Sequence, residues 1–338
     1  MTHTVSIPHE FAPQDRIFTC WPAARELWED DLEPAQAEFA QFIRLLAGGG
    51  ETAQPITILA ATRQAEASAK SALGSRSTVV RAAYGDVWAR DTGPVFRSRD
   101  GQMEAVQFRF NGWGGKYELP GDDEVGGVIA GLAGVPLKKV DLTCEGGALE
   151  FDGAGGVLTT RQCVLSDFRN PDRSEADVEA LLRETLGVET IYWIDRGLYF
   201  DHTDGHIDNI ARFAAPGVVV CQTPNGKDDP QADVLMEISS QLRAMKQPDG
   251  TPFRIIEIPS PGRVEGEDGK PMPASHMNWV AAFNRIILPV YDEKPGKSAA
   301  RALQDALPGK RVLTSPARAI LTGGGAFHCV TCNLPRHR

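Results

Sequence analysis

Five short polar motifs recur along this chain at comparable intervals, and their spacing constrains the fold more than any other feature. One polar residue can be used to mark each motif: Asp91, Glu145, His206, Asn278 and Cys329. Successive markers are separated by 54, 61, 72 and 51 residues. A strand is expected beside each motif and another after it. Repetition of this kind indicates similar units that pack against one another. We therefore predict five similar units arranged around one centre.

The pattern of apolar residues alternates between helical and strand-like spacing from one end of the chain to the other. The expected helices cover residues 33–47, 62–73, 123–133, 174–186, 229–245 and 298–307. The expected strands cover residues 17–21, 55–60, 79–84, 104–110, 137–142, 190–194, 218–222, 253–258, 286–291 and 311–314. The helix at 174–186 has Ser174 as its expected N-cap and Gly187 as its expected C-cap. This interleaving predicts an α/β fold and argues against an all-β propeller.

No low-complexity linker divides the 338 residues, of which 42% are hydrophobic. Length alone permits one large domain or two. The stretch 259–273 is rich in proline, glycine and charge, and it lies between two expected strands. It is therefore interpreted as a rim or lid loop rather than a domain boundary. We predict one catalytic domain over residues 1–338.

Charge and cysteine usage narrow the class of partner. The net charge of −10 argues against nucleic-acid binding, and an acidic field would attract a small cation. The chain contains no apolar run long enough to span a membrane and no signal pattern at its start, so no membrane partner is expected. Six scattered cysteines are typical of a reducing compartment, which predicts a cytoplasmic protein.

The C-terminal motif places one cysteine after three glycines, at Gly323-Gly324-Gly325-Ala326-Phe327-His328-Cys329. The apolar run at 318–321 is expected to be a strand that opens into a loop and presents the thiol. Upstream lie the acidic and histidine-rich stretch 201–208 and the motif 88–91. A thiol, an imidazole and carboxylates are the groups needed to attack a cationic, guanidinium-like carbon.

Six motifs in this order closely resemble those of agmatine deiminases of the bacterial peptidylarginine deiminase family, within the guanidino-group-modifying enzymes. The resemblance runs from about residue 10 to 335 and rests on Trp21-Pro22-x-x-Arg25-x-x-Trp28, Asp86-x-Trp88-x-Arg90-Asp91-x-Gly93-Pro94, Phe110-Asn111-Gly112-Trp113-Gly114-Gly115-Lys116, Glu145-Gly146-Gly147, His206-x-Asp208 and Gly323-Gly324-Gly325-x-x-His328-Cys329. It implies the pentein fold, in which five ββαβ units surround a pseudo-fivefold axis with the active site at the centre.

The resemblance also implies a role for each residue of the site. Cys329 would be the nucleophile, and His206 the general acid and base. Asp91 and Asp208 would hold the guanidinium nitrogens, and Glu145 would lie close to the histidine. Trp88 and Trp113 could wall the site by stacking on the cation, although plain core aromatics would look the same. The implied substrate is a small cationic guanidine, and no cofactor or metal is required.

Several alternatives stay open at this point. Cys329 could be a buried core cysteine, and Cys332 makes a Cys-x-x-Cys that could serve redox chemistry or zinc. Asp91 could pair with Arg90, and Glu145 could be a turn or cap residue. On a strand, alternate residues at 202, 204, 206 and 208 would share one face and could bind a divalent metal, giving a metal-dependent amidohydrolase: His202, Asp204, His206 and Asp208.

The substrate is the least constrained of these predictions. Ala326 stands where the agmatine branch usually has asparagine, and Arg109 stands where tryptophan is more typical. An arginine there could bind a carboxylate, which agmatine lacks, or it could pair with a surface acid. Agmatine is therefore preferred, with arginine and peptidylarginine as alternatives. The roles of Asn278 and Cys332 are unassigned, and a homodimer is expected only because small-molecule enzymes of this size often form one.

Overall fold

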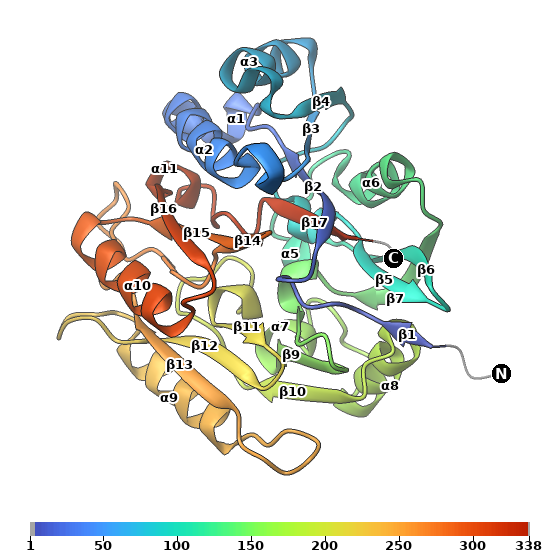
Figure 1. Ribbon diagram of the computed structural model, residues 1–338, viewed down its shortest axis with the longest axis vertical. Helices are drawn as coiled ribbons and strands as arrows, with labels where there is room; N and C mark the ends of the chain where they lie inside the picture. The colour runs from blue at the N-terminus through green and yellow to red at the C-terminus, as the bar shows by residue number, and fades with distance from the viewer. Residues whose placement is uncertain (1–3, 337–338) are drawn as a thin grey trace.

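The computed structural model describes residues 4–336, whose strands form five separate sheets (Figure 1). The first sheet contains β17 (Thr331–Pro335), β2 (Gln14–Cys20), β3 (Ile56–Ala60) and β4 (Thr78–Arg81). The second contains β1 (Val5–Ser6), β5 (Val95–Arg99), β6 (Gln102–Arg109) and β7 (Leu137–Thr143). The remaining three are β8 (Glu150–Phe151), β9 (Gly156–Thr160) and β10 (Thr190–Ile194); β11 (Ala211–Ala215), β12 (Val218–Thr223) and β13 (Arg254–Pro259); and β14 (Val280–Ala282), β15 (Arg285–Val290) and β16 (Arg311–Pro316).

All five sheets share one pairing scheme. An antiparallel pair comes first, and its second strand then pairs in parallel with a third, as in β8–β9–β10 and β14–β15–β16. In the first sheet the antiparallel partner of β2 is β17, so the two ends of the described chain share one sheet. Each of the five motifs immediately precedes the first strand of its sheet, at β5, β8, β11, β14 and β17. The expected strand after each motif is thus confirmed.

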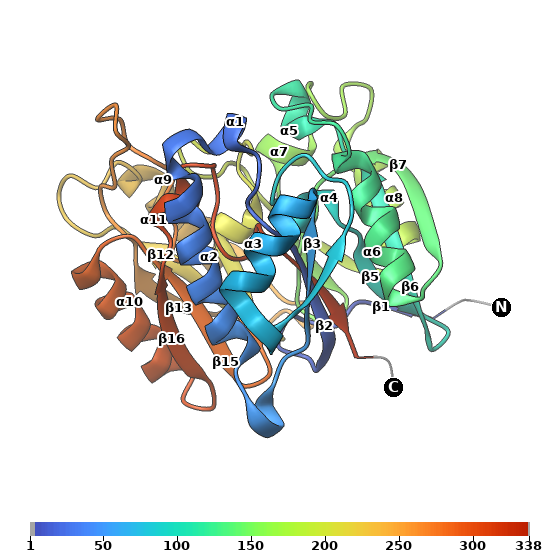
Figure 2. The same cartoon turned by 90° about the horizontal axis from the view of Figure 1, so that it is seen from above.

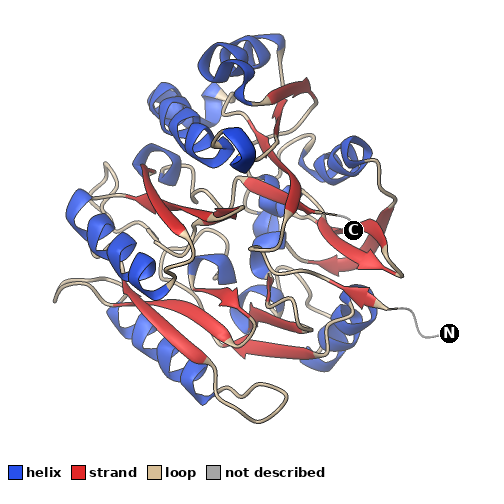
Figure 3. Cartoon of the chain, viewed as in Figure 1, coloured by secondary structure: helices blue, strands red, loops and turns tan. Residues whose placement is uncertain are grey.

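Helices occupy the parallel crossovers, which must carry the chain from one end of the sheet to the other. The longer helices are α2 (Leu32–Ala47), α3 (Arg63–Leu73), α6 (Val125–Ala133), α8 (Glu175–Leu186), α9 (Ala232–Ala244) and α10 (Glu293–Ala306). Figures 1 and 3 show them at the periphery, with the strands inside. In α8 the expected caps are confirmed, because Ser174 forms a capping box and Gly187 adopts left-handed φ of 67°.

Short helical turns lie nearer the centre or link the units. They are α1 (Arg25–Trp28), α4 (Ala89–Thr92), α5 (Gly112–Gly115), α7 (Arg161–Val164), α11 (Arg318–Leu321), and the 3₁₀ turns η1 (Glu29–Asp31), η2 (Gly50–Thr52), η3 (Gly74–Arg76), η4 (Asp122–Glu124), η5 (Gly146–Ala148) and η6 (Ile207–Asn209). No helix between residues 4 and 336 is both long and apolar enough to cross a membrane.

The apolar run at 318–321 was expected to be a strand, and this prediction is wrong. The segment forms α11, and Cys329 lies just before β17 instead of following a strand. The physical reason is a distant residue: the Glu38 carboxylate on α2 accepts hydrogen bonds from the first three backbone amides of the turn, at 3.1, 2.8 and 3.0 Å. A run of four residues has no periodicity that could distinguish the two structures.

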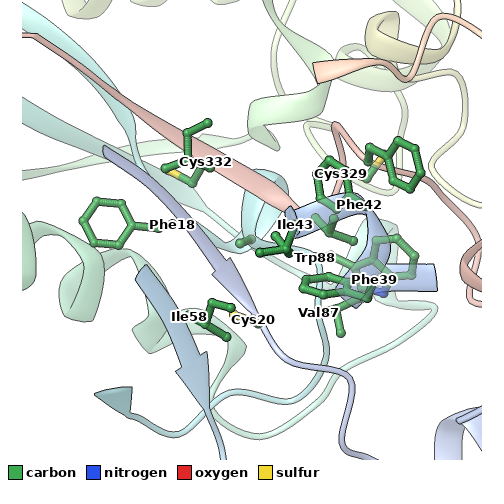
Figure 4. Packing of buried hydrophobic residues seen from close by; sticks show 14 of the residues in the cluster. Phe18, Cys20, Phe39, Phe42, Ile43, Ile58, Val87, Trp88, Cys329 and Cys332 are labelled. Atoms are coloured by element: carbon green, nitrogen blue, oxygen red, sulfur yellow. The ribbon is translucent and has the colours of Figure 1, made fainter. Parts of the chain in front are cut away.

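The largest apolar cluster packs α2 and α3 against the first sheet and extends to the C-terminal motif. Phe42 on α2 stacks on Phe327 with ring centroids 4.3 Å apart, two residues before Cys329. Figure 4 shows part of this cluster, in which Cys332 lies on the Phe18 side, away from Cys329. The core therefore fixes the segment that carries the thiol.

Candidate active site

A cavity of about 250 Å³ opens above Cys329 and is bordered by segments from several units. Figure 2 shows α1 and α5, which both contribute to it, at the same edge of the molecule. Its lining is aromatic and acidic: Leu27, Trp28, Asp86, Trp88, Asp91, Trp113, Tyr117, Leu119, His202, Thr203, Thr322, Gly323, Gly324 and Cys329. A hollow of this size suits a small molecule better than a folded partner.

Cys329 lies at the floor of the cavity with 2% of its surface exposed. Its carbonyl accepts a hydrogen bond from the backbone of Arg90, and its own backbone nitrogen donates to the Asn278 side chain. The glycines before it allow close packing, because a Cβ at Gly325 would lie 2.7 Å from Trp88 and 3.1 Å from the Cys329 sulfur. The glycine run therefore permits a close approach of the backbone to the thiol.

Two carboxylates flank the thiol. The Asp208 Oδ2 atom is 3.5 Å from the Cys329 sulfur, and its Oδ1 atom is buried without a hydrogen-bond partner. Asp91 accepts hydrogen bonds from the Trp113 indole at 2.9 Å and from the Gly147 backbone at 3.1 Å. Arg90 points elsewhere, toward Asn333, so the alternative ion pair between Asp91 and Arg90 is absent among the described side chains.

His206 is completely buried between Asp91 and Glu145. Its Nδ1 atom lies 3.6 Å from Asp91, and its Nε2 atom lies 3.4 Å from Glu145. Glu145 also accepts hydrogen bonds from the buried Arg169 at 3.0 Å. Glu145 makes no side-chain cap bond to the following turn, so its alternative reading as a cap is not supported.

The charges of these groups are set by burial and by one another. Burial raises the pKa of the Cys329 thiol well above its usual value, and Asp208 and Asp91 raise it further. Burial likewise raises the pKa of Asp91 to about 6. For His206, burial favours the neutral ring, but the Asp91 and Glu145 carboxylates outweigh it and raise the pKa well above its usual value. These shifts favour a neutral thiol at Cys329 and a protonated ring at His206.

A network that the motifs did not reveal holds Asp208 in place. Burial opposes ionisation of Asp208, but a 2.7 Å hydrogen bond from His328 Nδ1 outweighs it and lowers the pKa. His328 Nε2 lies 2.8 Å from a Glu10 carboxylate oxygen, and Glu10 is paired with the buried Arg212. Arg212 also pairs with Glu150 at 2.8 Å. Only the position of His328, next to Cys329, was a signal in the sequence.

Gly147 lies where any side chain would collide with three polar groups of the site. A Cβ added there would lie 2.6 Å from His206 Nδ1, 2.7 Å from Asp91 Oδ1 and 3.1 Å from Asp208 Oδ2. Real Cβ atoms do not approach polar atoms so closely, and these side chains are buried. The Glu145-Gly146-Gly147 motif therefore contributes a carboxylate and also a residue without a side chain, against which the polar groups can pack.

Aspartate side chains hold the tryptophan rings that line the cavity by accepting hydrogen bonds from their indoles. Asp86 accepts hydrogen bonds from the indoles of Trp28 and Trp88 at 2.9 and 2.8 Å, and the two rings stack 6.3 Å apart. Trp113 adopts left-handed φ of 54°, which is rare for a bulky residue, and Asn111 stabilises this turn by accepting from the Gly114 backbone. Both expected wall residues, Trp88 and Trp113, line the cavity, and Trp28 and Tyr117 join them.

The alternative metal site at positions 202–208 does not assemble. The segment is a turn and not a strand, with Asp204 at φ of 65° and Gly205 at 95°. Asp204 pairs with Lys116 and Arg169, and the His202 ring stacks on Tyr117. Two other groups of three among the described residues bring ligand-type atoms within 4.8 Å, and arginines pair with their carboxylates: Glu145, Cys163 and His206; Glu10, Glu150 and His328.

Two residues flagged by the sequence lie outside the cavity. The Cys332 sulfur contacts the Pro94 carbonyl at 3.3 Å, so it does not face Cys329 across a Cys-x-x-Cys site. Arg109 is largely exposed, donates to Thr143 at 3.1 Å and lies 3.3 Å from Asp141. The surface-acid interpretation of Arg109 is thus confirmed, and the carboxylate-binding one is not supported.

The model of the Porphyromonas-type peptidyl-arginine deiminase family matches residues 6–335. The chain belongs to this family. An agmatine deiminase of Stutzerimonas stutzeri (strain A1501) is 31% identical over 353 residues, covering 97% of this chain and 95% of that protein. The solved agmatine deiminase of Enterococcus faecalis matches with a TM-score of 0.92 at 27% identity, covering 99% and 96% of the two chains. A cysteine-to-serine variant of the C. jejuni agmatine deiminase, solved with substrate bound, matches with a TM-score of 0.90 at 26% identity over 100% and 98%. These findings confirm the family resemblance and the α/β fold.

Proposed function

We propose that this protein hydrolyses the guanidinium group of agmatine to release ammonia and N-carbamoylputrescine. The observation that carries this proposal is a pair of buried, unpartnered polar atoms beside the thiol, Asp208 Oδ1 and His206 Nδ1. Buried polar atoms are nearly always hydrogen-bonded, so two such atoms without a hydrogen bond in one site indicate that a ligand binds there. One is a carboxylate oxygen and the other an imidazole nitrogen. A planar cation with several N–H donors satisfies the first. The second can give its proton to the amine nitrogen that forms once the guanidinium carbon has been attacked.

The proposed reaction follows from the charges. The guanidinium offsets the two carboxylates that oppose ionisation of Cys329, so the thiol releases its proton to solvent and the thiolate forms when substrate binds. The thiolate attacks the guanidinium carbon, and His206 donates its proton to the departing nitrogen, which leaves as ammonia. An S-alkylthiouronium remains on Cys329. The neutral His206 then accepts a proton from water, whose oxygen attacks the carbon and returns the electron pair to sulfur.

The cavity favours agmatine over arginine. Within the described residues, no lysine or arginine lines it, so an α-carboxylate would find no cationic partner there. The wall instead offers Trp28, Trp88, Trp113 and Tyr117, whose faces suit methylene groups and an ammonium.

Ammonia release from agmatine, arginine and a blocked arginyl peptide, each with EDTA present, tests the proposal. We expect agmatine to be the preferred substrate by about 10²-fold or more in kcat/KM, because burying an unpaired carboxylate costs several kcal/mol. Arg109→Ala is the control and is expected to leave agmatine turnover unchanged. Preference for arginine would overturn the substrate, and loss of activity in EDTA would overturn the metal-free mechanism.

The raised pKa of Asp91 predicts the acid limb of the pH profile. Asp91 must be ionised to bind a cation, and burial places its pKa at about 6. The slope of log kcat/KM for agmatine against pH should therefore steepen as the pH drops through this value, because protonated Asp91 no longer attracts the cation and this loss adds to that of the thiolate. A profile measured in the range where circular dichroism shows a folded protein provides the check. A slope that stays constant to well below pH 6 would contradict it.

We infer further that the five sheets are five copies of one ββαβ unit around a pseudo-fivefold axis, the pentein arrangement, within a single catalytic domain. The shared pairing scheme and the position of one motif before each first strand support this. So does the meeting of the β2 and β17 ends in one sheet.

A further inference from the structure

Asn278 contacts the nucleophile directly, although its role was unassigned from the sequence. It lies in the loop before β14 with 1% of its surface exposed. Its Nδ2 atom is 3.0 Å from the Cys329 sulfur. Its Oδ1 atom accepts hydrogen bonds from the backbone nitrogens of His328 and Cys329, at 2.9 and 3.2 Å. One side chain thus contacts both the reacting atom and the backbone that carries it.

The chemistry of these partners fixes the orientation of the amide. Backbone N–H groups can only donate, so the Asn278 oxygen must face the two amides of residues 328 and 329. Its NH₂ group must therefore face the sulfur. The second hydrogen of that group is directed to Asn209 Oδ1, 2.9 Å away. The group that Asn278 offers to the sulfur is accordingly an N–H donor.

This donor, like a backbone hydrogen bond at Ala326, opposes the influences that disfavour the thiolate. Asp208 on η6 and Asp91 on α4 both face Cys329 and disfavour the thiolate, as does burial. The Tyr291 phenol, after β15, is also near enough to interact with it, and His328 adjoins it in the chain. Among these neighbours, Asn278 supplies a neutral hydrogen bond to sulfur that strengthens when the sulfur becomes an anion.

We propose that Asn278 is a further catalytic residue, whose side-chain N–H stabilises the Cys329 thiolate while its Oδ1 holds the backbone of residues 328–329. The proposal rests on the thiol mechanism proposed above. The N–H would act twice, before the sulfur electron pair forms the bond to carbon and again when hydrolysis breaks that bond and returns the pair to sulfur.

Alkylation of Cys329 by iodoacetamide, followed by peptide mass spectrometry without substrate, tests the proposal in two variants. Asn278→Ala removes the N–H donor and the oxygen that accepts from both backbone amides. Asn278→Asp has the same size and keeps that acceptor oxygen, but it replaces the NH₂ group with an oxygen and places a negative charge at the sulfur. At alkaline pH, where the new carboxylate is ionised, we expect alkylation to slow about tenfold or more in Asn278→Ala and further in Asn278→Asp, because one pKa unit is a factor of ten in thiolate.

A purely structural role gives a different result. It predicts that Asn278→Ala alkylates with the same dependence on pH as wild type, because the thiol pKa would be unchanged, and this result would overturn the proposal. Ser275→Ala is the matched control and should alkylate at the wild-type rate. It removes a buried hydroxyl in the same loop, and this hydroxyl donates to the Asn209 carbonyl and not to the sulfur. If Asn278→Ala does not fold, Asn278→Leu, which fills the space of the amide and has no N–H, replaces it in the same measurement.

Turnover of agmatine gives an independent readout. We expect kcat/KM to fall about 10²-fold in both variants, as when a hydrogen-bond donor is removed from a developing charge. If alkylation is slowed in the Asn278 variants but wild type releases no ammonia, the contact between the N–H and the sulfur is supported and the proposed function is refuted. Ammonia release by wild type with unaltered alkylation in both variants would refute the contact and support the function.

Discussion

Replacing Cys329 with serine is expected to lower kcat/KM for ammonia release from agmatine by about 10⁴-fold or more. A serine hydroxyl ionises far less readily than a thiol, and burial together with Asp208 and Asp91 already disfavours an anion at this position. The bound guanidinium can offset that effect for sulfur but not for an alkoxide. Ammonia assays on purified protein, with circular dichroism to verify folding, provide the measurement.

Cys332→Ser is the matched control for this change. It removes a second buried thiol three residues away, whose sulfur contacts the Pro94 carbonyl and does not reach the cavity. We expect its activity to stay within a few fold of wild type. Acid-quenched wild type should also carry a covalent adduct on Cys329, detectable by mass spectrometry. Substantial turnover by Cys329→Ser, or a loss of equal size in Cys332→Ser, would refute the assignment.

Gly147→Ala is expected to lower kcat/KM by about 10²-fold, because displacing reacting groups by about 1 Å has effects of that size. The new Cβ would lie 2.6 Å from His206 Nδ1 and 2.7 Å from Asp91 Oδ1, so the imidazole and the carboxylate would have to move apart. The φ of Gly147 is not positive, and alanine can adopt its backbone without strain. The expected loss therefore comes from the polar groups of the site and not from misfolding.

Gly131→Ala provides the comparison. Gly131 lies in α6, and a Cβ there would meet nothing within 4 Å. Because alanine is the better helix former by roughly 0.5–1 kcal/mol, this variant should keep its activity and melt at a slightly higher temperature. If Gly147→Ala retained wild-type kcat/KM, the space at residue 147 would not be required for catalysis.

Local patterns predicted many of the elements. The helix at 174–186 was recognisable because its cap residues and apolar spacing act within a few positions of one another, and α8 has the expected caps. The strand at 190–194 is β10 with unchanged ends. The motif residues Cys329, His206, Asp208, Asp91 and Glu145 do meet at one point.

Local patterns failed where the deciding contact came from far along the chain. The turn at 318–321 is helical because Glu38 accepts hydrogen bonds from its backbone amides. Arg169 carried no signal, yet it is the buried partner of Glu145. Of the two histidines at 202 and 206, only the second is buried with the carboxylates, since the turn at Asp204 and Gly205 breaks the alternation that a strand would have imposed.

The sequence by itself determined the α/β class, the five-motif rhythm, the thiol motif and the family, because each depends on the order of residue types along the chain and not on which side chains meet in space. Only the tertiary structure decided which polar atoms meet and which face one another. Asn278 illustrates the difference, since nothing near it in the chain indicates that its N–H would face a sulfur 51 residues away. Such contacts depend on how whole units pack together, and that packing is the sum of many interactions that no short segment encodes.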